Sequence, residues 1–162
     1  MIISTKELEL VRHDEEDPKV KELLNDPAIL ESMSEARSYP APMPSMVCFS
    51  IQKDGHVIGQ VCLKRIRWIN HKAEISLFIT GQEQGKGYGL AALQAIMDFG
   101  FNRLNLYRLE GEVIDGNTPS MKLMNKLGFV EEGRLREAKF VNGKYFDLLR
   151  YGILRREFED KK

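Results

Sequence analysis

A short glycine-rich segment carries the clearest chemical signal in this sequence of 162 residues. Residues 84–89 read Gln-Gly-Lys-Gly-Tyr-Gly and lie between a predicted strand and a predicted helix. Glycines let a backbone curl tightly and turn its N–H groups outward. The following helix adds its first unpaired N–H groups and the positive end of its dipole. This arrangement favours binding of a phosphate or pyrophosphate, whereas the alternative interpretation is a flexible loop before an ordinary helix start.

Two common phosphate-binding motifs do not fit this loop. A P-loop has four residues between its first Gly and its Gly-Lys, followed by Ser or Thr. Here three residues separate Gly81 from Gly85, and Gly87 stands at the hydroxyl position. A Rossmann fingerprint reads Gly-x-Gly-x-x-Gly, but the spacing here is Gly-x-Gly-x-Gly. The loop therefore predicts a phosphate site of another kind, with a nucleotide as one candidate ligand.

The segments around the loop predict a mixed sheet with helices on its faces. Strands are expected where apolar residues alternate, and Asp-Gly or Asn-Gly turns join two pairs of them. Helices are expected where apolar residues recur every three to four positions. They are also expected to begin at a proline, because proline suits the first turn of a helix. The predicted strands are 7–12, 46–53, 57–67, 72–79, 108–114, 129–140 and 144–154; the predicted helices are 19–25, 28–35, 90–102 and one that Thr118 caps and Gly128 ends. This order of elements indicates an α/β (α+β) fold.

Composition and charge exclude several classes of protein. The chain has 24 basic and 24 acidic residues, and this balance argues against electrostatically driven binding of nucleic acid. No stretch approaches the roughly 18 apolar residues of a membrane helix, and the first residues lack the apolar region of a signal peptide. We therefore expect a cytoplasmic protein with no nucleic-acid and no membrane partner.

Three further groups of residues are expected to have no chemical role. Cys48 and Cys62 lie in apolar stretches without a Cys-x-x-Cys motif or a Cys/His cluster, which predicts neither a metal site nor a disulfide scaffold. The basic residues around Trp68, which include Arg65, are interpreted as a solvated end of a hairpin. Residues 155–162 are expected to form a solvated tail.

The loop and its surroundings resemble the GNAT N-acetyltransferases. Gln84, Gly87 and Gly89 match the family motif Gln/Arg-x-x-Gly-x-Gly/Ala. Residues 73–77 are similar to the strand before this motif, and residues 117–129 to the helix after it. Residues 132–147 are similar to the C-terminal hairpin of one branch of the family, which contains ribosomal-protein N-terminal acetyltransferases and spermidine acetyltransferases. The resemblance covers about residues 46–156.

The resemblance implies a fold, a co-substrate and its binding residues. The expected fold is a single GNAT acetyltransferase domain over residues 1–162, with a mostly antiparallel sheet of six to seven strands and about four helices. The implied co-substrate is acetyl-CoA, without a metal. Its pyrophosphate would lie on the glycine-rich loop and its pantetheine arm beside the preceding strand. The implied binding residues are Phe78, Ile79, Thr80, Gln84, Gly85, Lys86, Gly87, Tyr88, Gly89, Leu90, Asn117 and Ser120.

The implied reaction is direct attack of a primary amine on acetyl-CoA. The amine arrives as ammonium and must lose a proton, and Glu74, which shares a strand face with Ser76, is the candidate base. A second candidate role is that of a carboxylate that binds the substrate, and the alternative is a solvated surface glutamate. Ser120 is the candidate proton donor to the leaving thiolate, or else a hydroxyl that only bonds backbone. Backbone N–H groups of the strand 72–79 would hold the developing oxyanion.

Two positions depart from the family and leave alternatives open. Met124 stands where many members have a tyrosine that protonates the thiolate, and Lys139 stands where the branch has a glutamate base. These departures favour an alternative function as a non-catalytic acyl-CoA-binding or sensing module. Protein N-termini, polyamines and other small amines all stay open as acceptors, since the choice depends on residues 26–46, where the resemblance is weakest. Relatives often pair, so a homodimer is also expected.

Overall fold

The computed structural model describes residues 2–4, 9–11, 17–32 and 43–160, in two units that divide after Met43. The N-terminal unit contains β1 (Ile2–Ser4) and β2 (Glu9–Val11), which pair antiparallel, and the short helices α1 (Pro18–Leu24) and α2 (Pro27–Ser32). Helix α1 begins at its proline because the Asp17 carboxylate accepts hydrogen bonds from the N–H groups of Lys19 and Val20, at 2.9 and 3.3 Å. Residues 33–42, part of the region expected to choose the acceptor, lie outside the described residues.

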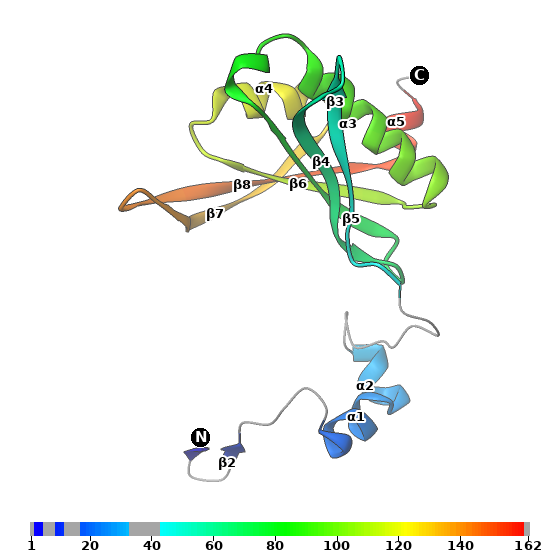
Figure 1. Cartoon of the computed structure of the whole chain (residues 1–162). Helices are drawn as coiled ribbons and strands as arrows, with labels where there is room; N and C mark the ends of the chain where they lie inside the picture. Colours follow the sequence, from blue (N-terminus) through cyan, green and yellow to red (C-terminus); the bar gives the residue numbers. More distant parts are fainter. Residues whose placement is uncertain (1, 5–8, 12–16, 33–42, 161–162) are drawn as a thin grey trace. The chain divides into compact units, whose positions relative to one another are not determined.

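The C-terminal unit is built on a six-stranded sheet (Figure 1). Its strands are β3 (Val47–Lys53), β4 (His56–Arg67), β5 (Lys72–Ile79), β6 (Arg108–Ile114), β7 (Val130–Val141) and β8 (Lys144–Leu154). They lie in the order β3-β4-β5-β6-β8-β7, and only β5 and β6 run parallel. The Asp54-Gly55 turn joins β3 to β4, and the Asn142-Gly143 turn joins β7 to β8. All four turn residues have positive φ, as type I′ turns require. The predicted mixed, mostly antiparallel sheet is confirmed.

Helices α3 and α4 pack on one face of this sheet. The helical elements are a short 3₁₀ turn (Gly81–Glu83), α3 (Tyr88–Asp98), a π-helical turn (Phe99–Arg103), α4 (Thr118–Leu127) and α5 (Arg155–Glu159). Leu93 and Met97 of α3 are buried in one core with strand residues such as Leu63 and Leu109. In the part of the chain that the structure describes, no helix is both long and apolar enough to cross a membrane.

Two predictions about helices were wrong in detail. Asn117, rather than Thr118, caps α4, since its side-chain oxygen accepts a hydrogen bond from the Ser120 N–H at 3.3 Å. The expected solvated tail instead begins with helix α5, because the Phe158 ring packs on the buried Phe101 with 5.1 Å between ring centroids. The predicted end of α4 at Gly128 is confirmed, with φ of 87°.

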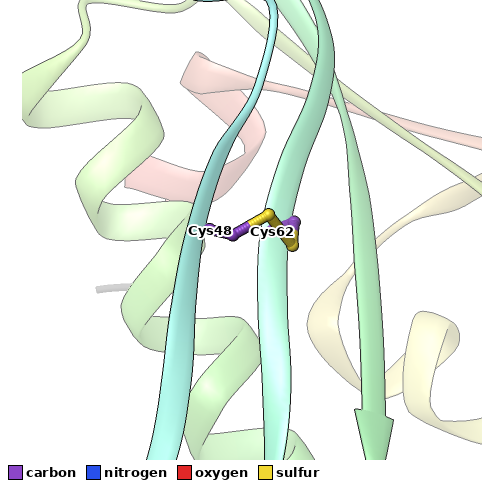
Figure 2. Close-up of a disulfide and its surroundings, with 2 residues drawn as sticks. All are labelled: Cys48 and Cys62. Atoms are coloured by element: carbon purple, nitrogen blue, oxygen red, sulfur yellow. A yellow bond between two sulfur atoms is a disulfide. The ribbon is translucent and has the colours of Figure 1, made fainter.

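The structure joins Cys48 and Cys62 in a disulfide across β3 and β4 (Figure 2). The prediction that the cysteines form no disulfide was therefore wrong. A regular hairpin from the Asp54-Gly55 turn would place Cys48 opposite Val61, but the register shifts between Ile51 and Gln52. This shift brings Cys62 opposite Cys48, with 4.1 Å between Cα atoms.

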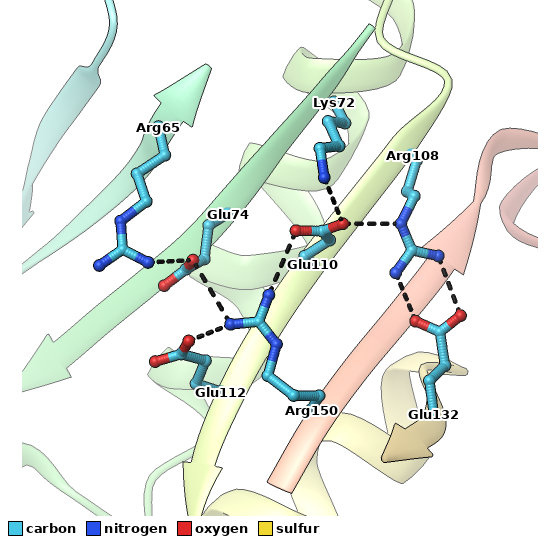
Figure 3. A network of polar contacts seen from close by, with 8 residues as sticks. All are labelled: Arg65, Lys72, Glu74, Arg108, Glu110, Glu112, Glu132 and Arg150. Atoms are coloured by element: carbon cyan, nitrogen blue, oxygen red, sulfur yellow. Dashed lines mark hydrogen bonds and ion pairs between the residues drawn. The ribbon is translucent and has the colours of Figure 1, made fainter. Parts of the chain in front are cut away.

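The face of the sheet opposite α3 and α4 carries a network of charged side chains (Figure 3). It consists of Arg65, Lys72, Glu74, Arg108, Glu110, Glu112, Glu132 and Arg150. At its centre, Glu110 accepts hydrogen bonds from Lys72 at 3.1 Å, Arg108 at 2.9 Å and Arg150 at 3.3 Å. Arg108 also contacts Glu132, and four cations balance four carboxylates.

Ion pairing lowers the pKa of two carboxyl groups in this network. For Glu110, burial opposes ionisation, but the hydrogen bonds from Arg108 and Lys72 outweigh it and hold the pKa below its ordinary value. For Glu132, the hydrogen bonds from Arg108 are the main cause of the lowered pKa. A carboxyl group with a lowered pKa in the folded state stabilises the fold at neutral pH and loses this contribution in acid.

Reduction of the Cys48–Cys62 bond should destabilise the C-terminal unit. The bond closes a loop of sequence separation 14, for which the loss of loop entropy in the unfolded chain predicts about 3 kcal/mol. We expect a lower urea midpoint with reductant in the wild type and no effect of reductant in the double variant Cys48→Ala, Cys62→Ala. Equal midpoints of oxidised and reduced wild type would contradict the stabilising role.

Substitution of Glu110 should cost stability in a pH-dependent way. Glu110→Gln should lower the free energy of unfolding at pH 7 by about 1–3 kcal/mol, because it removes charged hydrogen bonds from a largely buried site. The loss should shrink as the pH falls below 4.5, the ordinary pKa, and vanish below the folded-state pKa. Urea titrations across this range measure it. Glu132→Gln, at a more exposed site, is the control and should cost less than about 1 kcal/mol; a Glu110→Gln loss independent of pH would disprove the linkage.

Candidate active site

Strands β5 and β6 separate after a short parallel ladder. The ladder has three pairs, which are Lys72 with Arg108, Ala73 with Leu109, and Glu74 with Glu110. Beyond it, β5 stays paired with β4 as far as Ile79, and β6 stays paired with β8 as far as Ile114. The sheet therefore splits, and the inner edge of β5 has no partner strand among the described residues.

The glycine-rich loop follows β5 and forms an open cradle at the start of α3. Gly85 and Gly87 have φ of 74° and 86°, in the left-handed region that favours glycine. A Cβ atom added at either position would meet no atom within 4 Å, so the backbone is open to a ligand. Helix α3 begins at Tyr88, two residues earlier than predicted, and its first-turn N–H groups lack helical acceptors. The Gln84 side chain donates to the Ile79 carbonyl at 2.9 Å and ties the loop to β5.

A pocket of about 550 Å³, called here the loop pocket, lies beside this cradle. Its walls include eight of the residues that the sequence predicts for the cofactor: Phe78, Ile79, Gln84, Gly85, Tyr88, Gly89, Asn117 and Ser120. Four other predicted residues do not line it: Thr80, Lys86, Gly87 and Leu90. Lys86 is instead paired with Glu83 at 3.1 Å.

A second pocket of about 330 Å³, called here the split pocket, lies where β5 and β6 diverge. Its polar wall contains Glu74, Ser76 and Glu112, together with Lys64 and Arg65 of β4. The loop pocket and the split pocket share three lining residues, Leu77, Ser120 and Leu123. The two pockets therefore meet beside Ser120.

Ser120 lies in the first turn of α4, where the Asn117 cap fixes its backbone. Within the described residues, its hydroxyl group makes no hydrogen bond, so it does not serve as a backbone-bonding hydroxyl there. The hydroxyl is half-buried at the junction of the pockets. It is consequently available to a group bound between them.

Glu74 is a paired carboxylate, with its side chain 15% exposed. The Arg65 guanidinium lies 3.1 Å from it, and Arg150 approaches to 4.0 Å (Figure 3). The Arg65 side chain is 68% exposed, as expected for a solvated hairpin end, but it also lines the split pocket. Arg65 and Glu112 thus line the split pocket, and Arg150 pairs with its carboxylates; sequence reasoning predicted none of the three as a site residue. The alternation of Glu110 and Glu112 on β6 was the available signal for the charged face.

The two positions that depart from the family pattern have different surroundings. Met124 is buried in the core and lines the split pocket, and Gly111 of β6 leaves room for its methyl group. Lys139 lies on the exposed strand β7 and lines neither the loop pocket nor the split pocket. Its partner across the hairpin is Phe146.

Comparisons with known proteins agree with this architecture. Residues 6–149 match the family model described as an acetyltransferase (GNAT) domain. The putative ribosomal N-acetyltransferase YdaF of Bacillus subtilis is 36% identical over 109 residues, which are 67% of this chain and 60% of the relative. The spermidine N(1)-acetyltransferase of Escherichia coli K12 is 36% identical over 110 residues, which are 68% of this chain and 59% of the relative. The chain thus spans about three fifths of the length of these curated relatives.

Solved structures show the same fold. Mutant forms of the spermidine/spermine N-acetyltransferase SpeG from Vibrio cholerae align with a TM-score of 0.71 and 32% identity, over 74% of this chain and 72% of that one. A dodecameric structure of the Vibrio cholerae spermidine N-acetyltransferase aligns with a TM-score of 0.70 and 32% identity, over 73% and 70% of the two chains. By sequence, fold and the placement of its glycine-rich loop, the chain belongs to the GNAT acetyltransferase family.

Proposed function

We propose that this chain is an N-acetyltransferase that transfers the acetyl group of acetyl-CoA to a primary amine. The observation that carries the proposal is the meeting of two pockets beside Ser120. The loop pocket offers an anion cradle at one end, and the split pocket offers charged and polar side chains for an acceptor. Membership of the GNAT family supports acetyl-CoA as the co-substrate.

Acetyl-CoA would bind along the loop pocket. Its pyrophosphate would accept hydrogen bonds from the backbone N–H groups of the cradle, residues 84–90, where the α3 dipole adds positive potential. Its pantetheine arm would run along residues 78–80 and pair with the free inner edge of β5 like an extra strand. Asn117 and Ser120 would contact the arm from α4. The thioester would then lie where the two pockets meet.

The chemistry is acyl transfer by direct attack. The acceptor ammonium loses a proton to Glu74, and the free amine nitrogen then forms a bond to the thioester carbon. Backbone N–H groups of β5 hold the oxyanion of the tetrahedral intermediate. When the intermediate collapses, the carbon–sulfur bond breaks and the CoA sulfur takes the Ser120 hydroxyl proton, while the positively charged nitrogen of the intermediate returns a proton to the Ser120 oxygen. The products are an N-acetyl amide and CoA.

The proposal extends to assembly and location. The dodecameric relative supports self-association, and a homodimer of this chain is the simplest form of it. Strand β7 lies at the edge of the sheet and exposes Leu135 and Phe140, which is consistent with a contact between copies. A cytoplasmic location stays a prediction from the sequence.

Thiol release from acetyl-CoA tests the function. The purified chain is incubated with spermidine, Ser- and Ala-starting peptides, an aminoglycoside and a set of amino acids, and free CoA thiol is measured. Release that depends on one acceptor class supports the proposal. Stabilisation by CoA without release from any acceptor would instead favour the non-catalytic acyl-CoA module. Stabilisation by ATP or NAD but not by CoA would favour a nucleotide binder.

A side chain in the cradle should block CoA binding. Gly87→Val should raise the Kd for CoA at least about tenfold, because the side chain occupies the open space at the backbone N–H groups. It should also lower stability by about 1–2 kcal/mol, since valine is strained at φ of 86°. Calorimetric titration measures the Kd. Gly55→Val is the matched control, because Gly55 has φ of 80° and equally open space but lies in the turn between β3 and β4, outside the cradle. Unchanged CoA affinity in Gly87→Val would refute the placement.

Removal of the Ser120 hydroxyl should slow turnover. Ser120→Ala should lower kcat by about 10²–10³-fold and change the Kd for acetyl-CoA less than twofold, because the hydroxyl acts on the leaving thiolate. Thr118→Ala removes a hydroxyl two residues earlier, outside both pockets, and should leave kcat unchanged. Full activity of Ser120→Ala would rule out the proton-donor role.

A further inference from the structure

The charges that line the split pocket do not suit a polycationic acceptor. Two carboxylates, Glu74 and Glu112, line it, but Lys64 and Arg65 line it as well. Arg150, which does not line the pocket, pairs with both carboxylates and with Glu110 (Figure 3). Two cations thus balance two carboxylates in the pocket lining, so the pocket lacks the excess of negative charge that would attract a polyamine.

Lys64 presents an uncompensated ammonium group to the pocket. It is half-buried on β4 and lies directly opposite Glu74 in the β4–β5 register. Despite this position, its side chain forms no ion pair or hydrogen bond within the described part of the chain. A half-buried cation without a protein partner favours an anionic ligand.

A β-bulge turns Arg65 toward the same pocket. Lys64 pairs with Glu74 and Arg67 pairs with Lys72, so two residues of β4 oppose the single residue Ala73. Regular alternation would point Arg65 to the core face, but its φ of 49° places it in the left-handed region, and Ile66 fills the core instead. An arginine in this conformation is uncommon, and strained backbone of this kind clusters at functional sites.

The Arg65 guanidinium has donors to spare. Its only hydrogen bond to a described residue is the one from Nη1 to Glu74 at 3.1 Å, and its side chain is 68% exposed. Guanidinium carries five N–H donors in a planar fork that matches a carboxylate. The remaining donors therefore face the pocket and the solvent at its mouth.

We propose that Lys64 and Arg65 form an anion subsite and that the acceptor is a primary amine with a carboxylate close to its amino group. The inference rests on the proposed function and names its substrate class. The subsite lies level with Glu74, and Ser76 follows roughly 7 Å along β5, nearer the junction of the pockets. A free amino acid with an acidic side chain and a peptide with an acidic N-terminal residue both supply an amine and a carboxylate at such a spacing.

Binding to the CoA-saturated protein tests the subsite apart from catalysis. The probes are glutamate, a Glu-starting peptide, their glutamine counterparts and spermidine, each titrated by calorimetry. We expect glutamate or the Glu-starting peptide to bind at least tenfold more tightly than its glutamine counterpart, and whichever does so identifies the source. Spermidine should bind more weakly than that acidic probe. Tighter binding of spermidine, or equal binding of the acidic and neutral probes, would overturn the subsite.

Variants of the subsite assign the preference to its residues. Lys64→Gln and Arg65→Asn should each reduce the preference for the acidic probe at least fivefold, with affinity for the neutral probe changed less than twofold. Asparagine tolerates positive φ, so Arg65→Asn removes the charge without added strain at the bulge. Arg67→Gln, which removes a cation of the same strand outside both pockets, is the control and should keep the preference. An undiminished preference in both subsite variants would exclude these residues.

Thiol release in the same panel separates the subsite from the proposed function. Acetylation of the acidic amine in preference to spermidine supports both. Preferential acetylation of spermidine overturns the subsite and leaves the transferase function standing. Tight binding of the acidic probe without thiol release from any acceptor supports the subsite and overturns the transferase function.

Discussion

The three-pair ladder between β5 and β6 is the constraint on which the rest of this structure depends. Each of the two strands stays paired with its outer neighbour over most of its length, so among the described strands the sheet opens between them. The opening exposes one edge of β5 and forms the split pocket. Helix α4 places Ser120 at the end of this pocket that meets the loop pocket. Met124, packed against Gly111, fills the space behind the opening.

The charged network explains how a sheet face with many ionisable groups stays stable. Four carboxylates and four cations alternate across five strands, so each partly buried charge meets an opposite one. Such pairs add modest net stability, because desolvation offsets much of their attraction. Their larger effect is on position, since the shared contacts of Arg150 hold Glu74 and Glu112 at the pocket wall.

Two register shifts in the β3–β4–β5 meander decide which side chains become neighbours, and regular strands would pair them differently. The shift in β3 places Cys48 opposite Cys62 and allows a disulfide. The bulge in β4 adds one residue and brings Arg65 to the same side as Lys64. In both cases a displacement by one position exchanges the neighbours of a side chain, because side chains alternate along a strand.

The sequence by itself determined most of the elements of the C-terminal unit and the anion cradle. The Asp54-Gly55 and Asn142-Gly143 turns, the alternation of strand 72–79 and the helix stop at Gly128 all depend on local backbone preferences. The glycine-rich loop is likewise local, since one short segment supplies both the curled backbone and the helix start. These features were therefore predicted with errors of a few residues.

Only the tertiary structure decided which side chains meet. The cap at Asn117, the disulfide, the packing of Phe158 on Phe101 and the turn of Arg65 into the pocket each depend on contacts or on register. The bulge in β4 has no distinct pattern in the sequence, yet it moves the side chains of the residues that follow to the opposite face of the sheet. The local sequence therefore predicts where a phosphate would lie, whereas the charge of the acceptor pocket depends on strands that are distant along the chain.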